Sequence, residues 1–121
     1  MRRTNNEMTR RRDFERGSVA AELAIALPAV VLALLLGVGA LGAAARQVSL
    51  QDAVADAARL LGRGESAAIA HAAVTASVSD ANVSSELRGD LSCVSARVDA
   101  VIGRIIHIPL TASSCALSGG L

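Results

Sequence analysis

The stretch LAIALPAVVLALLLGVGALGAAA, from Leu23 to Ala45, decides the fold because it contains no charged, amide or hydroxyl side chain. As an α-helix it is about 35 Å long, enough to cross a hydrocarbon core of ~30 Å. A soluble helix without a polar face needs a large protein around it, and a chain of 121 residues leaves too few for that. The sequence therefore predicts one transmembrane helix, which we assign to residues 18–45.

Charge is distributed unevenly on the two sides of this apolar run. Six of the 12 basic residues, all of them Arg, lie in residues 1–16 beside three acids, whereas the rest of the chain carries six Arg and eight acids. Short basic flanks resist translocation, so we expect a cytoplasmic N-terminus and an extracytoplasmic domain from Arg46 onward. With one Phe and no Trp or Tyr, the chain lacks the aromatic residues that stack on single-stranded nucleic acid, and no nucleic-acid partner is expected.

Glu22 lies at the edge of the apolar run, where an ionised carboxylate is costly unless it reaches the lipid headgroups or a cationic partner. Upstream, the basic leader ends in Arg16-Gly17, and Glu22 is the fifth residue after that glycine. This spacing, followed by Leu23-Ala24-Ile25-Ala26-Leu27-Pro28, resembles the precursors of type IV pilins. With the stretch from Asp52-Ala53 to Arg63-Gly64-Glu65, the chain resembles the TadE-like family of pseudopilins and minor pilins of tight-adherence pili.

The resemblance implies a processing step at the membrane. A prepilin peptidase would cut between Gly17 and Ser18 on the cytoplasmic side and remove the leader, residues 1–17. The new Ser18 amine would lie about one helical turn from Glu22, so that the carboxylate of one subunit can pair with the amine of its neighbour. The expected partners are membrane lipid, the peptidase, and other pilins or pilus-assembly proteins.

Three small residues, Gly39, Gly42 and Ala43, form a face of the apolar run at which another helix can approach closely. The same glycines belong to a G-x-G-x-x-G pattern, residues 37–42, which also occurs in dinucleotide-binding proteins. That motif needs a preceding strand and a helix that opens at the glycines, whereas these glycines lie inside the predicted span. No cofactor is therefore expected.

The helix is expected to continue beyond the span. An apolar stripe at helical spacing ends near Gly62 or Gly64 and consists of Leu50, Val54, Ala57, Ala58 and Leu61. A second helix is expected from Ser66 to about Val78, after the glycine break. Residues 46–79 are thus predicted to be an extracytoplasmic helical segment.

Residues 80–121 are predicted to form a small β-hairpin region. Asp80-Ala81-Asn82 predicts a turn, and Ser84 to Asp90 a loop or a short turn of helix. Apolar and polar residues alternate from Leu91 to Ile102 and again after Gly103-Arg104, which is typical of two half-buried strands. Folded about a three-residue loop, the two apolar faces coincide. We expect this face to pack on the helix stripe or on a partner through Val98, Ala100, Ile106, Ile108 and Leu110. The predicted fold class is α+β.

The same register sets Cys93 opposite Cys115 and Asp99 opposite Pro109. Because Pro109 has no N–H, this class of pairs is expected to be the non-hydrogen-bonded one, with Cα atoms about 4.5 Å apart, at the short end of the disulfide range. A Cys93–Cys115 disulfide is therefore predicted in an oxidising compartment. Two free thiols or a metal half-site are the alternatives, although two ligands make a poor zinc site.

Two other functions stay open. Arg11-Arg12-Asp13-Phe14 is similar to a twin-Arg export signal and Ala43-Ala44-Ala45 to a signal-peptidase site, which would release residues 46–121 as a secreted domain. A generic bitopic protein would keep its N-terminus uncut. The mature N-terminus separates the three readings, as Ser18, Arg46 or Met1.

Catalysis is not expected. No Cys/His/acid or Ser/His/Asp arrangement surrounds His71 or His107 in the sequence, so we predict no catalytic, metal-binding or small-molecule site.

Overall fold

The computed structural model describes residues 2–119, with side chains from Asn5 onward. Met1 and the side chains of Arg2 and Arg3, which belong to the predicted leader, lie outside the described residues. The elements, in chain order, are α1 (Arg2–Gly62), α2 (Ala67–Ser77), β1 (Asn82–Arg88), β2 (Leu91–Ile102) and β3 (Ile106–Leu117). The chain divides into two compact units between Val38 and Gly39.

The first unit is helix alone. α1 begins in the predicted leader and continues through Pro28, whose missing N–H removes one backbone hydrogen bond without ending the helix. Every residue from Leu23 to Val38 is exposed. α1 is long and apolar enough to cross a membrane once, which confirms the predicted N-terminal helix.

The second unit is built on the last part of α1, where the predicted apolar stripe is buried from Leu50 to Ala58. α1 ends at Gly62, one of the two expected positions. Gly64 follows with a φ of +90°, the left-handed conformation that favours glycine. Its N–H and that of Glu65 bond back to carbonyls in the last turn of α1, so the end of the helix is capped by its own chain.

α2 confirms the second predicted helix. It starts at Ala67, because Ser66 is the N-cap and its hydroxyl accepts a hydrogen bond of 3.3 Å from the Ile69 N–H. Its buried residues, Ala70 and Val74, face the same core as the stripe on α1.

The strands form an antiparallel sheet in the order β1-β2-β3. β2 and β3 pair in the predicted register, from Leu91 opposite Leu117 to Ile102 opposite Ile106, around the three-residue loop 103–105. The prediction of only a hairpin was incomplete, because residues 82–88 form β1 rather than a turn and a loop. β1 carries little sequence signal, since only Val83 among its residues is half-buried and its strand conformation depends on pairing with β2.

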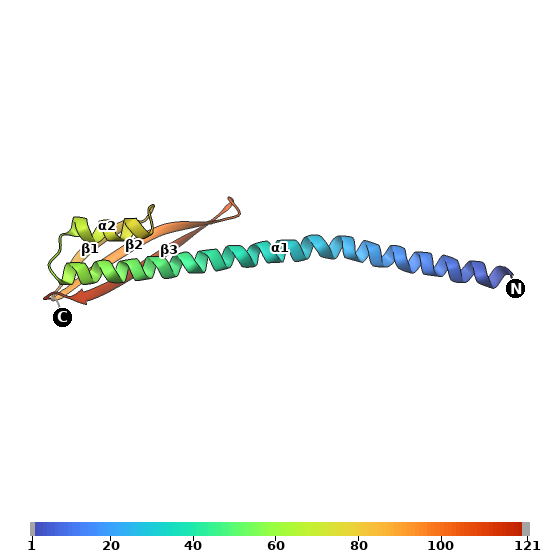
Figure 1. The fold of residues 1–121 in the computed structure, drawn as a ribbon, viewed down its shortest axis with the longest axis horizontal. Coiled ribbons are helices and arrows are strands. Elements are labelled where there is room, and N and C mark those ends of the chain that lie inside the picture. The colour runs from blue at the N-terminus through green and yellow to red at the C-terminus, as the bar shows by residue number, and fades with distance from the viewer. Residues whose placement is uncertain (1, 120–121) are drawn as a thin grey trace. The chain divides into compact units, whose positions relative to one another are not determined.

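One core unites α1, α2 and the sheet (Figure 1, green to red). From the sheet, Val94, Ala96, Val98 and Ala112 contribute to it, and Leu110 packs half-buried at its margin. Ala100 is also buried, as predicted. Ile106 and Ile108 are exposed, so they do not pack on the stripe of α1, and their packing on a partner stays a prediction. β1 pairs with β2 only as far as Arg97, so beyond that residue the sheet narrows to two strands.

Candidate processing and assembly site

The predicted processing site lies in the exposed part of α1. Gly17, Ser18 and Glu22 are all exposed, and a Cβ added at Gly17 would have no atom within 4 Å. Ser18 and Glu22 are four residues apart in a continuous helix, so they lie on the same side of it. The helix thus presents the predicted cleavage point and the predicted assembly carboxylate on an uncovered surface.

Glu22 stands at the border between two kinds of surface. The residues before it include the exposed arginines Arg10, Arg11, Arg12 and Arg16, and the residues after it are exposed and apolar, beginning with Leu23 and Ile25. Within the described part of the chain Glu22 makes no ion pair. In a membrane, a carboxylate in this position is stabilised by the interface or by a cation from another molecule.

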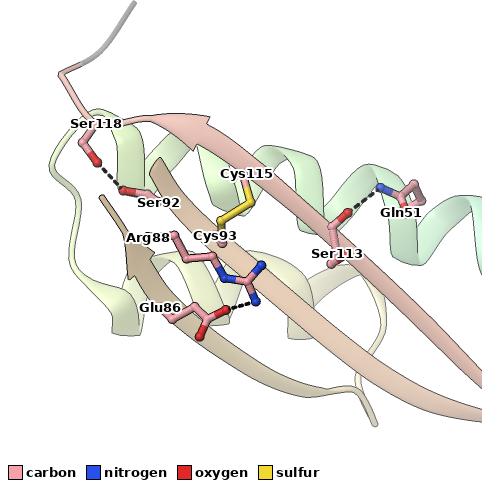
Figure 2. The surroundings of a disulfide bond; sticks show 8 residues. All are labelled: Gln51, Glu86, Arg88, Ser92, Cys93, Ser113, Cys115 and Ser118. Carbon is pink, nitrogen blue, oxygen red and sulfur yellow. Dashed lines mark hydrogen bonds and ion pairs between the residues drawn. A yellow bond between two sulfur atoms is a disulfide. The ribbon is translucent and has the colours of Figure 1, made fainter. Parts of the chain in front are cut away.

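The two predicted cysteines are brought together in the second unit. Figure 2 shows the Cys93–Cys115 disulfide between β2 and β3, with Cα atoms 4.0 Å apart. Cys93 is buried and Cys115 is exposed, and as directly opposite residues of an antiparallel pair they lie on the same face of the sheet. The disulfide prediction, including the register that led to it, is confirmed.

Two further side-chain contacts lie near the disulfide. Ser92 and Ser118 hydroxyls lie 2.8 Å apart, and Glu86 forms an ion pair with Arg88 on β1 (Figure 2). Ser92 is buried although it is polar, and its bond to Ser118 satisfies it. The Ser92–Ser118 contact ties the last described residues to the start of β2, whereas the Glu86–Arg88 pair lies within β1.

Sequence reasoning missed the polar contacts that join α1 to the domain. Gln47 donates from Nε2 to the Thr111 carbonyl at 2.9 Å, and Gln51 does the same to the Ser113 carbonyl at 3.2 Å. These amides cover backbone acceptors of β3, an edge strand. The available signal was a pair of amide side chains one helical turn apart, just after the apolar run.

Arg46, the first charged residue after the apolar run, was also missed as a contact residue. Its guanidinium forms an ion pair with Asp80 in the turn between α2 and β1. The pair is partly exposed, so it contributes little stability by itself. It does attach the start of the polar part of α1 to the domain.

The two histidines lie apart from any cluster. His71 is within hydrogen-bonding distance of the Ser85 hydroxyl, 3.0 Å from Nε2, and His107 is exposed on β3. Over the described residues, no three His, Cys, Asp or Glu side chains come together in a way that would hold a metal ion.

These features define a class of protein: a small α+β domain, stapled by a disulfide, on a single N-terminal helix apolar enough to cross a membrane. Within that class, the family model of TadE-like proteins matches residues 17–59. This segment is similar to TadE-like proteins, in agreement with the resemblance in the sequence. The match begins at Gly17 and ends near the C-terminal end of α1, so the sheet lies outside it. No curated protein and no solved structure matches the chain.

Proposed function

We propose that this protein is a pseudopilin or minor pilin, a membrane-anchored structural component of tight-adherence pilus assembly. The proposal is supported by the TadE-like match, which covers the segment with Gly17, Glu22 and the apolar run. TadE-like proteins are in general structural rather than enzymatic. The role proposed here accordingly depends on helix packing and surface contacts, with other pilins and assembly proteins as partners.

The proposed orientation has the N-terminus in the cytoplasm, residues 18–45 in the membrane, and the domain of residues 46–121 outside. The basic leader favours this direction. The Cys93–Cys115 disulfide supports it independently, because disulfides persist in oxidising compartments and are rare in the cytoplasm.

The proposed maturation is cleavage between Gly17 and Ser18 by a prepilin peptidase. Gly17 sits in an uncovered stretch of α1, and glycine destabilises a helix interior by about 1 kcal/mol relative to alanine, so local opening there is inexpensive. Removal of the leader exchanges a cluster of arginines for a single α-amino group next to the membrane.

The observation that carries the proposal is the exposed Glu22, one helical turn after Ser18 and next to an apolar surface. An ion pair between the Glu22 carboxylate of one subunit and the Ser18 amine of its neighbour lowers the desolvation cost of both groups. Such a pair would set the register of helices in an assembly.

The decisive experiment is to determine the N-terminal residue of the protein recovered from membranes of cells that also express a prepilin peptidase. We expect Ser18. Gly17→Val should leave the leader attached, whereas Gly37→Val, an equally uncovered helical glycine, should not. Recovery of Met1 from the unaltered chain in the presence of an active peptidase would overturn the proposal.

The same experiment tests the secreted alternative, which requires Arg46 at the N-terminus. That alternative is disfavoured because the bond between Ala45 and Arg46 lies inside α1. The next residues are engaged with the domain, Arg46 through Asp80 and Gln47 through Thr111.

A further inference from the structure

Ile102, the last residue of β2, lies against Gly39 of α1. A Cβ added at Gly39 would come within 2.6 Å of Ile102 Cγ2, so only glycine permits this approach. Gly42 and Ala43 line the same junction opposite Ala100 and Ile102. At Gly39, the small-residue face for which the sequence predicted another helix is thus contacted by the chain's own hairpin, whereas Gly42 stays exposed.

This contact lies well inside the apolar run. Arg46, the first charged residue of the run's C-terminal flank, is seven residues beyond Gly39, or about 10 Å along the helix. A span of ~20 residues counted from Leu23 ends at Gly42, which leaves Gly39 about 5 Å inside the hydrocarbon edge. A bilayer around the apolar run therefore reaches the level of the hairpin turn.

The hairpin end is itself apolar and uncovered. We define the apolar tip as Val101, Ile105, Ile106 and Ile108, all of which are exposed. Ile105, in the turn, is 85% exposed. An isoleucine exposed to water forgoes about 1.5–3 kcal/mol of favourable burial free energy. Clustered exposed side chains of this kind mark a contact surface rather than a solvated turn.

The charges near the apolar tip suit a lipid surface. Arg104 lies in the turn next to Ile105, and its long side chain can extend to a lipid phosphate while its stem stays in an apolar layer. Asp99 is the only acid on β2 and β3, and it lies three residues before Ile102, about 10 Å back along the strand. No carboxylate therefore lies on the apolar tip.

We propose that the apolar tip inserts into the membrane interface beside α1, with the Arg104 guanidinium at the lipid phosphates. The inference rests on the proposed membrane anchoring of α1. Lipid is the occupant because Ile102, at the base of the tip, contacts Gly39, and Gly39 belongs to the apolar run that is proposed to lie in the membrane. The backbone of the turn is compatible with this position, since the Ile105 N–H bonds to the Ile102 carbonyl and the strands satisfy each other. The domain would then be attached to the membrane at two points, by the helix and by the apolar tip.

The chain contains no Trp or Tyr, so a single introduced Trp reports its own surroundings. We suggest three variants of the full chain in phosphatidylcholine/phosphatidylglycerol vesicles with brominated acyl chains. Ile105→Trp probes the apolar tip and Val30→Trp the middle of the apolar run. Leu87→Trp is the matched control, an exposed apolar residue of β1 at the other end of the sheet, where Leu117 meets Gly62, about 35 Å along α1 from Gly39.

We expect bromine to quench Val30→Trp and Ile105→Trp several-fold more than Leu87→Trp. Quenching of Ile105→Trp should be strongest with bromine near the headgroup. Adding Gly39→Val should lower the quenching of Ile105→Trp, because the larger side chain displaces Ile102 and with it the apolar tip.

The outcomes separate the inference from the function on which it rests. If Val30→Trp is quenched and Ile105→Trp matches Leu87→Trp, the apolar tip is outside the membrane and the inference is wrong while the anchor stands. If Val30→Trp is not quenched, the anchor itself is wrong. If Ile105→Trp escapes quenching and yet emits at a short wavelength, as a Trp buried in protein does, a second copy is the occupant and the lipid contact is contradicted.

Discussion

The carbonyl oxygen of Leu117 lies 2.7 Å from the point that a Cβ on Gly62 would occupy. The end of α1 and the end of β3 are thus in backbone contact, and Gly119 reinforces it by donating its N–H to the Gly62 carbonyl at 2.9 Å. The sheet is therefore joined to the helix by the chain's last described residues, at the end of α1 that closes the core.

Gly62→Ala should destabilise the domain by about 1–3 kcal/mol, because the added methyl group meets a backbone atom that cannot rotate away. The change in the free energy of unfolding is measured by urea unfolding in detergent, followed by circular dichroism. Gly42→Ala is the control: it is also helical, and a Cβ there meets nothing within 4 Å. Equal stability of the two variants would show that the Gly62 contact is not tight.

Leu50→Ala should lower the free energy of unfolding by about 2–5 kcal/mol, since Leu50 is completely buried in the core. Val48→Ala, two residues earlier on the same helix, should change the free energy of unfolding by less than about 0.5 kcal/mol because Val48 is 60% exposed. The same unfolding assay compares them. Similar losses for both variants would be incompatible with the stripe of α1 described above.

Removal of the Cys93–Cys115 disulfide should lower the free energy of unfolding by about 3 kcal/mol, as expected when a loop of roughly this length is no longer closed. The comparison is between the unaltered chain and the double variant Cys93→Ala/Cys115→Ala. Alkylation and mass measurement without reductant provide the control. Two freely alkylated thiols in protein from an oxidising compartment would contradict the bridge.

Glu22→Ala should abolish assembly into pili while leaving the domain folded, because the substitution removes the proposed partner of the neighbouring Ser18 amine. Glu15→Ala is the matched control, since Glu15 lies in the leader that processing is proposed to remove. Surface pili are counted by electron microscopy, and the disulfide reports folding. Normal piliation with Glu22→Ala would rule out the ion pair.

Local patterns in the chain were sufficient for the helix and the hairpin. The apolar run from Leu23 to Ala45 could only be a helix, since in lipid every backbone group needs a partner within the segment. The hairpin register followed from side-chain alternation, because a slip by one residue would turn every apolar side chain to the wrong face. That register alone placed Cys93 opposite Cys115.

The assignments that failed depended on contacts between distant segments. β1 pairs with β2 through backbone groups that are the same in any sequence, and its exposed side chains left no periodic signal. Ile106 and Ile108 alternate as core residues do, yet β1 does not extend along β2 beyond Arg97 and both are exposed, so of the two expected places for them only a partner is left as a prediction.

The role of Gly39 likewise required the tertiary structure. A glycine in an apolar helix indicates that another segment can approach closely, but it does not say which segment. Only the tertiary structure shows that Ile102 contacts Gly39. Periodicity along the chain therefore determined which face of each element is apolar. What covers that face was decided by the tertiary structure, because covering it depends on the lengths and packing of elements far apart in the sequence.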